Sequence, residues 1–204
     1  MTLPSTLRTE RLLLRSWRPN DAATLHSVLV ANTSRLRPWI PPHVAEPSTI
    51  PELELRLAGF AEAFDASREW RYAIFATEGL VPLGEVSVFP RASSGRVPLA
   101  DADRVEIGYW LSAEAAGRGF ATEAARAALD AASALEGLTR AEIRCDARNE
   151  RSGAVPRRLG FLLSETVVEP ALLGGAPTTV EVWSRLLGHS GPRSRSLLDD
   201  GERG

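Results

Sequence analysis

The sequence predicts an α/β fold in which a mixed, mostly antiparallel sheet is flanked by helices. One segment alternates apolar with polar or small residues at the period of a strand; its apolar positions are Val105, Ile107, Tyr109 and Leu111. Another segment repeats apolar residues at helical spacing: Leu53, Leu57, Phe60 and Phe64. Strand-like and helix-like segments interleave along the chain, which is the order expected of a mixed sheet.

Seven strands are expected, each from a short apolar segment bounded by turn residues. They cover residues 11–17, 72–76, 83–89, 105–111, 141–145, 161–167 and 178–187. The last two should form an antiparallel pair across the Gly174-Gly175 turn. The polar, glycine-containing segment 91–103 is expected to be a loop.

About four helices are expected between these strands. The first opens at Pro19, and the second begins near Thr49, whose spacing to Glu52 matches a capping box. The third follows a glycine-containing loop after residue 116 and ends at Gly137. The fourth is short and covers residues 152–159.

Prolines interrupt two regions of the chain. Segment 36–43 contains three prolines, which remove donors and fix the backbone, so no regular structure is expected there. Pro156 lies inside the expected fourth helix and should bend it or distort its first turn.

Length and composition indicate one globular domain, residues 1–187, followed by a disordered tail, 188–204, that has little to bury. The 204 residues carry a net charge of −2, which gives no basic surface for a nucleic acid. Apolar runs are too short to span a membrane, and no signal peptide is visible. A single cysteine suits the cytoplasm, and the scattered histidines give no metal spacing.

The most informative segment is the loop that joins the strand ending at Leu111 to the third helix. Gly117 and Gly119 leave the backbone open, and the helix that follows directs unpaired N–H groups and a positive dipole end forward. A phosphate can approach such amides closely. The loop therefore predicts an anion cradle, with a ligand-free tight turn as the structural alternative.

Neighbouring residues limit which cofactor this cradle could hold. A mononucleotide P-loop requires Gly-Lys-Ser/Thr, whereas this loop reads Gly119-Phe-Ala-Thr, so that interpretation fails. A dinucleotide fingerprint needs glycine or alanine at Thr122 and an acidic residue near Glu142. Several strands precede the loop, which a dinucleotide fold does not expect, so this alternative is the weaker one.

Four segments in series carry a resemblance to a known family. They are Glu106-Ile-Gly-Tyr-Trp-Leu, Gly117-Arg-Gly-Phe-Ala-Thr-Glu-Ala, Asn149-Glu-Arg-Ser and Arg158-Leu-Gly-Phe. Together they resemble the GNAT superfamily of acyl-CoA-dependent N-acetyltransferases. The opening Leu7-Arg-Thr-Glu-Arg-Leu-Leu-Leu-Arg and the later Leu36-Arg-Pro-Trp are similar to the ribosomal-protein alanine/serine acetyltransferases of RimJ/RimL type. The likeness covers about residues 7–187.

The resemblance implies central strands that splay apart to admit the pantetheine arm of acetyl-CoA. It places cofactor contacts at the end of the splayed strand and in the glycine loop: Leu111, Ser112, Ala113, Gly117, Arg118, Gly119, Phe120, Ala121 and Thr122. Exposed amides around 111–113 would also stabilise the oxyanion. The family usually has Gln or Arg where Ala116 stands, so one side-chain contact to the pyrophosphate is expected to be lost.

Acyl transfer to an amine needs a proton acceptor for the ammonium group. Glu106 is the first candidate, because it lies near the cofactor end of the strand, and Glu85 on the neighbouring strand is the second. Either carboxylate could act through a water. The alternative for Glu106 is a solvated strand glutamate without a chemical role.

The departing thiolate needs a proton donor, and the resemblance assigns this role to Ser152. It also assigns a hydrogen bond with the cofactor's amide chain to Asn149. The structural alternatives are a helix cap for Ser152 and a turn residue for Asn149. Tyrosine often serves as the acid in this superfamily, but Tyr72 and Tyr109 both lie outside the expected fourth helix.

Cys145 alternates with Ile143 on a strand and has no adjacent histidine, so a buried core cysteine is favoured over a covalent acyl carrier. Trp39, in the proline-rich segment, and Trp110 are assigned to the acceptor. The expected function is transfer of an acetyl group to a primary amine, first a protein or peptide N-terminus. A small-molecule amine and a non-catalytic acyl-CoA sensor are the alternatives, and a homodimer is compatible with the resemblance.

Overall fold

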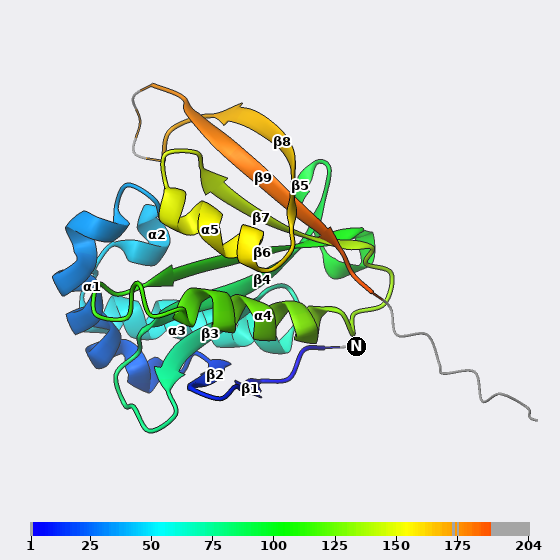
Figure 1. The fold of residues 1–204 in the computed structure, drawn as a ribbon. Helices are drawn as coiled ribbons and strands as arrows, with labels where there is room; N and C mark the ends of the chain where they lie inside the picture. Colours follow the sequence, from blue (N-terminus) through cyan, green and yellow to red (C-terminus); the bar gives the residue numbers. More distant parts are fainter. Residues whose placement is uncertain (1, 173, 175, 189–204) are drawn as a thin grey trace, which may run out of the picture.

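The computed structural model describes residues 2–172, 174 and 176–188, and one mixed sheet runs through this part of the chain (Figure 1). Its spatial order is β1-β2-β3-β4-β6-β7-β9-β8, with β5 pairing to β4. The strands are β1 Thr6–Arg8, β2 Leu12–Ser16, β3 Trp70–Ala76, β4 Gly84–Ala92, β5 Gly95–Arg96, β6 Arg104–Leu111, β7 Arg140–Asp146, β8 Leu162–Glu169 and β9 Thr178–Leu186. Every pairing is antiparallel except that of β6 with β7.

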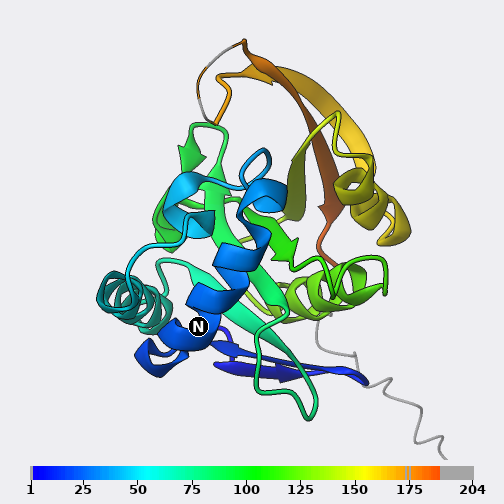
Figure 2. The same cartoon turned by 90° about the vertical axis from the view of Figure 1, so that its left-hand side faces the viewer.

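Helices cover both faces of the central strands (Figure 2), whereas the edge strand β8 is mostly exposed. They are α1 Ala22–Leu36, α2 Pro42–Ala45, α3 Ile50–Asp65, α4 Phe120–Ala132 and α5 Glu150–Arg158. Helices α1 to α3 pack with Ala73, Phe75 and Trp110 on one face. Helices α4 and α5 contribute to a second apolar cluster, which includes Ile74 and Ile107 from the opposite face.

Local sequence explains where two of the helices begin and how they pack. Thr49 and Glu52 form the expected capping box at the start of α3, and the helix buries Leu53 and Leu57. The buried face of α4 is rich in alanine, including Ala124 and Ala128, so the helix can approach the sheet closely. The predicted second and third helices are thereby confirmed.

Four short elements were not predicted from sequence: β1, β5, α2 and the 3-10 turn η2 Leu99–Asp101, which lies with β5 in the segment expected to be a loop. The sheet of the described residues has nine strands instead of seven, because β1 and β5 pair as short hairpin arms beside β2 and β4. Strands of three and two residues are too short to show a periodic pattern. The segment expected to be irregular contains helix α2, whose first residue is Pro42, a position where a helix needs no backbone donor.

Two predicted features fall partly outside the described residues. The expected tail is described only at Gly188, and the expected turn before β9 only at Gly174. Within the described part of the chain, none of the helices is long and apolar enough to cross a membrane.

Candidate active site

Strands β6 and β7 form the opening of the candidate site. Their parallel pairing covers only three register pairs, of which Glu106 with Glu142 is the last. Beyond that pair β6 continues to Leu111 and β7 to Asp146, and the two strands diverge (Figure 1). The predicted splay of the central strands is confirmed, and Glu106 lies at its vertex.

The glycine loop between β6 and α4 presents unpaired backbone donors. Gly117 and Gly119 have φ of +78° and +82°, a conformation that favours glycine, and Gly119 is the N-cap of α4. No side chain caps this helix, and within the described chain the amides of residues 117–122 donate to no protein acceptor. Six free donors and the positive end of a helix dipole fit the phosphates of coenzyme A.

The amides expected to be exposed at the end of β6 are mostly used within the protein. The Ser112 amide donates to the Leu83 carbonyl at 2.8 Å, and the Ala113 amide donates to Asn32 Oδ1 at 2.7 Å. Asn32 is buried on α1 and was not singled out from sequence. The prediction that Ser112 and Ala113 offer free donors to pantetheine and an oxyanion is therefore wrong for this structure.

Tyr109 and Ser152 meet where β6 faces the first turn of α5. The Tyr109 hydroxyl donates to the Ser152 carbonyl at 2.9 Å and accepts from Ser152 Oγ at 3.3 Å. Burial raises the pKa of Tyr109 well above its usual range, so the hydroxyl stays protonated at neutral pH. The sequence placed Tyr109 among the alternating apolar positions of its strand but gave no sign that α5 would reach it.

Pro156 explains why the Ser152 carbonyl is available to Tyr109. In an α-helix the carbonyl of residue 152 would accept from the amide of residue 156, and proline has no amide hydrogen. Helix α5 nevertheless runs through Pro156 to Arg158. The proline therefore leaves one carbonyl free in the helix, and that carbonyl binds the tyrosine hydroxyl.

The cap of α5 is Asn149, whose side chain accepts from the Ser152 amide at 3.2 Å. This contact supports the structural role expected as the alternative for Asn149. Its Oδ1 is already used within the protein. Ser152 does not cap the helix, because it lies in the first turn with its hydroxyl directed to Tyr109.

Cys145 lies on β7 beside this pair and is buried. Burial raises the pKa of the thiol to about 11, with a smaller contribution from the Glu181 carboxylate, while hydrogen bonds with Ser152 and Trp183 act in the opposite direction. A thiolate nucleophile is therefore scarce at neutral pH. This agrees with the expectation of a core cysteine.

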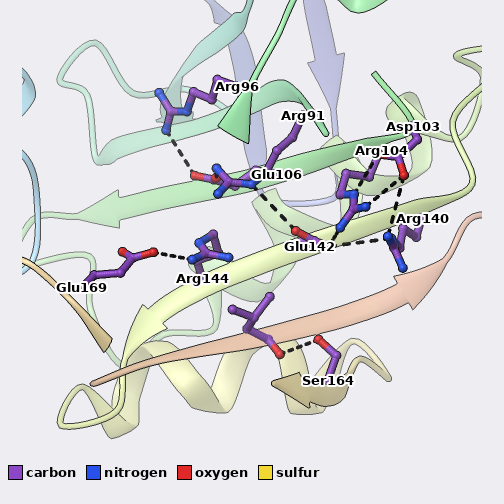
Figure 3. A network of polar contacts seen from close by, with 11 residues as sticks. Arg91, Arg96, Asp103, Arg104, Glu106, Arg140, Glu142, Arg144, Ser164 and Glu169 are labelled. Atoms are coloured by element: carbon purple, nitrogen blue, oxygen red, sulfur yellow. Dashed lines mark hydrogen bonds and ion pairs between the residues drawn. The ribbon is translucent and has the colours of Figure 1, made fainter. Parts of the chain in front are cut away.

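The Glu106 carboxylate is held by two arginines (Figure 3). Its Oε2 lies 2.6 Å from Arg91 Nη1 and its Oε1 lies 3.1 Å from Arg96 Nη2. Glu142, its partner across the vertex, is bound in turn by Arg104 at 2.7 Å. A carboxylate with both oxygens engaged by guanidinium groups is poorly suited to accept a proton, so the network argues against Glu106 as the base.

Glu85 is equally occupied, and only 3% of the residue is exposed. It accepts hydrogen bonds from Arg71 at 2.9 Å, Trp17 Nε1 at 2.7 Å and Ser87 at 3.2 Å. Arg71 is itself buried and also pairs with Glu69. Glu85 therefore neutralises a buried guanidinium, and these contacts argue against it as a second base.

The two tryptophans assigned to the acceptor lie at different depths. Trp110 is 6% exposed, and its indole Nε1 is one of two buried side-chain donors without a partner in the described chain. Trp39 is half-buried after α1, with the Arg148 guanidinium 6.0 Å from its ring. Arg148 follows β7, so Trp39 lies close to the open end of the splayed strands.

A groove of about 1020 Å³ runs beside the glycine loop. It is lined by the β1–β2 turn, the outer side of α4 and Arg158 of α5, and it includes Gly117, Gly119 and Thr122. Among the described residues no cluster of His, Cys, Asp and Glu could hold a metal ion.

Comparison with known proteins identifies the family. A protein-family model described as an acetyltransferase (GNAT) domain matches residues 11–162 of this chain. The chain belongs to the GNAT acetyltransferase family. It is an N-acetyltransferase that uses acetyl-CoA, and the RimJ/RimL-type resemblance is supported by its relatives.

One relative is YdaF of Bacillus subtilis, named for ribosomal N-acetyltransferase activity. It is 30% identical over 163 residues, which cover 75% of this chain and 79% of YdaF. Among solved structures, RimL, the ribosomal L7/L12 α-N-protein acetyltransferase in complex with coenzyme A, superposes with a TM-score of 0.75 at 21% identity. That match covers 93% of this GNAT chain and 99% of RimL.

Two further structures share the fold. The ribosomal-protein-S5-alanine acetyltransferase of Vibrio fischeri matches with a TM-score of 0.76 at 22% identity, covering 93% of this chain and all of that one. The microcin C7 self-immunity acetyltransferase MccE, in complex with acetyl-CoA and AMP, matches with a TM-score of 0.76 at 20% identity, covering 90% and 97%. At these identities the structures establish a common GNAT fold.

Proposed function

We propose that this GNAT enzyme acetylates the α-amine of a protein N-terminus. YdaF, named as a ribosomal N-acetyltransferase, supports a ribosomal-protein acceptor at 30% identity. RimL, named as an α-N-protein acetyltransferase, supports the N-terminal α-amine. Within the structure, the proposal depends on the splay of β6 and β7 beyond Glu106. The free amides of the glycine loop lie beside this splay. Trp110, whose indole donor has no partner in the described chain, faces helices α1 to α3.

The amides of residues 117–122 are proposed to hold the pyrophosphate of acetyl-CoA, which supplies the acetyl group as a thioester. The free donors support this assignment, and so does Gly119, whose φ of +82° would be strained in a residue with a side chain. Leu111, at the end of β6, is the remaining candidate for a contact with the pantetheine arm. Asn149 caps α5 and Ser112 follows β6, and the contacts they make within the protein hold these two elements in place beside the splay.

Ser152 is proposed to donate a proton to the departing thiolate, with Tyr109 as its neighbour in a pair of hydroxyls. Their 3.3 Å contact supports this assignment, because it places the serine hydroxyl beside a tyrosine hydroxyl that stays protonated at neutral pH. Neither Glu106 nor Glu85 is free to serve as base. An α-amine has a pKa of about 8, so roughly a tenth of it is unprotonated at pH 7 and can react without a dedicated carboxylate.

The acceptor is proposed to enter on the α1–α3 face, between Trp39 and the end of β6. The buried indole donor of Trp110 supports a hydrogen bond with a carbonyl of the acceptor, because an unpaired buried donor costs free energy until a partner arrives. Replacing Trp110 by Phe keeps most of the packing and removes this donor. We expect a higher KM for the acceptor peptide and an unchanged KM for acetyl-CoA.

The matched control is Trp183→Phe. The Trp183 indole already donates to Glu181 at 3.0 Å on the other face of the sheet, so its loss should leave the peptide KM unchanged. Equal effects of both substitutions on the peptide KM would contradict the proposed acceptor contact.

The function itself is tested with purified protein, acetyl-CoA and a panel of acceptors. The panel contains peptides with free N-termini, the same peptides blocked at the N-terminus but carrying lysine, polyamines, an aminoglycoside and an aminoacyl nucleotide. Thiol release and peptide mass should identify the free N-terminal peptides as the best acceptors. Preference for any of the small amines would overturn the acceptor class, and coenzyme A binding without turnover on every acceptor would favour a sensor.

A further inference from the structure

The turn between β1 and β2 contacts the glycine loop, although the two are more than a hundred residues apart in sequence. Arg11 donates from Nε to Glu123 Oε2 at 2.7 Å and from Nη1 to the Arg118 carbonyl at 3.1 Å. Thr9 Oγ1 and the Arg11 amide both donate to Glu123 Oε1, at 2.6 and 3.1 Å. We call Thr9, Arg11 and Glu123 the hairpin lock.

The hairpin lock fixes the orientation of one peptide in the cradle. In a trans peptide the C=O and N–H groups point in opposite directions, and the described chain contains no cis peptide. Because the Arg118 carbonyl points to Arg11, the Gly119 N–H group points away from Arg11. That amide has no acceptor within the described chain, so it is one of the donors offered to a phosphate.

This peptide needs an external restraint because glycine follows it. Gly119 has no Cβ, so the 118–119 peptide can rotate at little steric cost, and rotation would replace an N–H donor in the cradle by a carbonyl. The Arg11 guanidinium also lies 4.8 Å from the Phe120 ring, which is buried. Packing and hydrogen bonds together hold the guanidinium in place.

We propose that Arg11 is a positioning residue for the cofactor's pyrophosphate, acting through the Arg118 carbonyl and the Gly119 amide. The proposal rests on the cofactor site described above and extends it to the β1–β2 turn. The proposal also fits the presence of Ala116, where the family usually has Gln or Arg. Without that side-chain contact to the pyrophosphate, binding depends more on the direction of the loop amides.

Replacing Glu123 distinguishes positioning by Arg11 from simple attraction between the Arg11 charge and the phosphates. A carboxylate in the first turn of α4 repels a phosphate, so charge alone predicts that Glu123→Gln tightens the binding of coenzyme A. Positioning predicts the opposite, because glutamine cannot bind Thr9, the Arg11 amide and the guanidinium together. We expect Glu123→Gln to weaken binding about tenfold, which corresponds to about 1.4 kcal/mol.

Arg11→Lys gives the second comparison. Lysine keeps the positive charge but lacks the planar fork that binds Glu123 and the Arg118 carbonyl at once. Positioning predicts a loss of affinity of about tenfold, whereas charge attraction predicts affinity close to wild type. The matched controls are Arg68→Lys and Glu62→Gln, which alter an exposed pair 2.9 Å apart that makes no recorded contact with the loop.

The experiment measures coenzyme A affinity by calorimetry and the KM for acetyl-pantetheine, which lacks the phosphates. Both lock variants should bind coenzyme A more weakly, with the acetyl-pantetheine KM and both controls unchanged. Wild-type affinity in either lock variant, or tighter binding by Glu123→Gln, would overturn this inference alone. Failure of the wild-type protein to bind coenzyme A would instead overturn the proposed cofactor site.

Discussion

Replacing Pro156 by Ala should lower the turnover number while leaving the fold about as stable as before. The new amide at residue 156 can donate to the Ser152 carbonyl, which now accepts from Tyr109 at 2.9 Å. The tyrosine hydroxyl then loses the partner that orients it toward Ser152 Oγ. If that orientation is worth one neutral hydrogen bond of about 1 kcal/mol, kcat falls about fivefold.

The contributions of Pro156→Ala to the free energy of unfolding nearly cancel. Removing proline from a helix interior gains about 3 kcal/mol relative to alanine. Pro156 is buried, so losing two ring methylenes costs about 1.6 kcal/mol, and losing the Tyr109 bond costs about 1 kcal/mol. The net change stays below about 1 kcal/mol, which shifts Tm by less than about 4 °C.

Steady-state thiol release measures kcat, and the KM for acetyl-CoA should not change. Pro51→Ala is the matched control, because Pro51 lies in the first turn of α3 where its missing amide has no helical acceptor. In a Tyr109→Phe background the effect of Pro156→Ala should disappear, since both substitutions remove the same contact. An unchanged kcat in the single variant would refute the role given to the free carbonyl.

Three other substitutions test the assignments around the splay. Ser152→Ala should lower kcat by about a hundredfold with little change in acetyl-CoA affinity, and equal turnover would leave the serine without a role as acid. Glu106→Gln should destabilise the protein by about 1–2 kcal/mol, because Arg91 and Arg96 lose a charged partner, yet retain activity; inactive but folded protein would restore Glu106 as the base. Cys145→Ala should retain turnover, since a covalent intermediate is not used. The raised thiol pKa makes the Cys145 contribution to stability complete below about pH 8.5 and lost as the pH rises toward 11, so denaturation curves of Cys145→Ala should lack this decline.

Much of the fold could be predicted because its long elements carry periodic patterns. The alternation around Ile107 identified β6, and the spacing around Leu57 identified α3. The short strands β1 and β5 could not be found this way, since each is stabilised by pairing with a longer neighbour. Helix α2 could not be predicted because prolines generally break helices, although Pro42 occupies a first position that tolerates proline.

Only part of the candidate site could be predicted from the sequence, because part of it depends on contacts between distant segments. The glycine loop is local in sequence, so its conformation and free amides could be expected from Gly117 and Gly119. Glu106 looked free because the sequence does not show that the β4–β5 hairpin brings Arg91 and Arg96 to its carboxylate. Such contacts depend on register and hairpin geometry.

Contacts between distant segments were the other omission. Tyr109 and Ser152 lie 43 residues apart, and only the packing of α5 on the sheet brings their hydroxyls together. Pro156 was recognised as a disturbance of that helix, but the consequence of its missing amide depends on which group faces the freed carbonyl. The sequence therefore shows that residue 156 has no amide hydrogen, but not that the freed Ser152 carbonyl accepts from Tyr109.

The most direct measurement is an NMR titration of ¹⁵N-labelled protein with coenzyme A, compared with pantetheine. The amide resonances of residues 117–122 should shift on addition of coenzyme A and should remain in place with pantetheine, because only coenzyme A carries the pyrophosphate. Saturable binding of coenzyme A with these amide resonances unmoved would contradict the phosphate cradle.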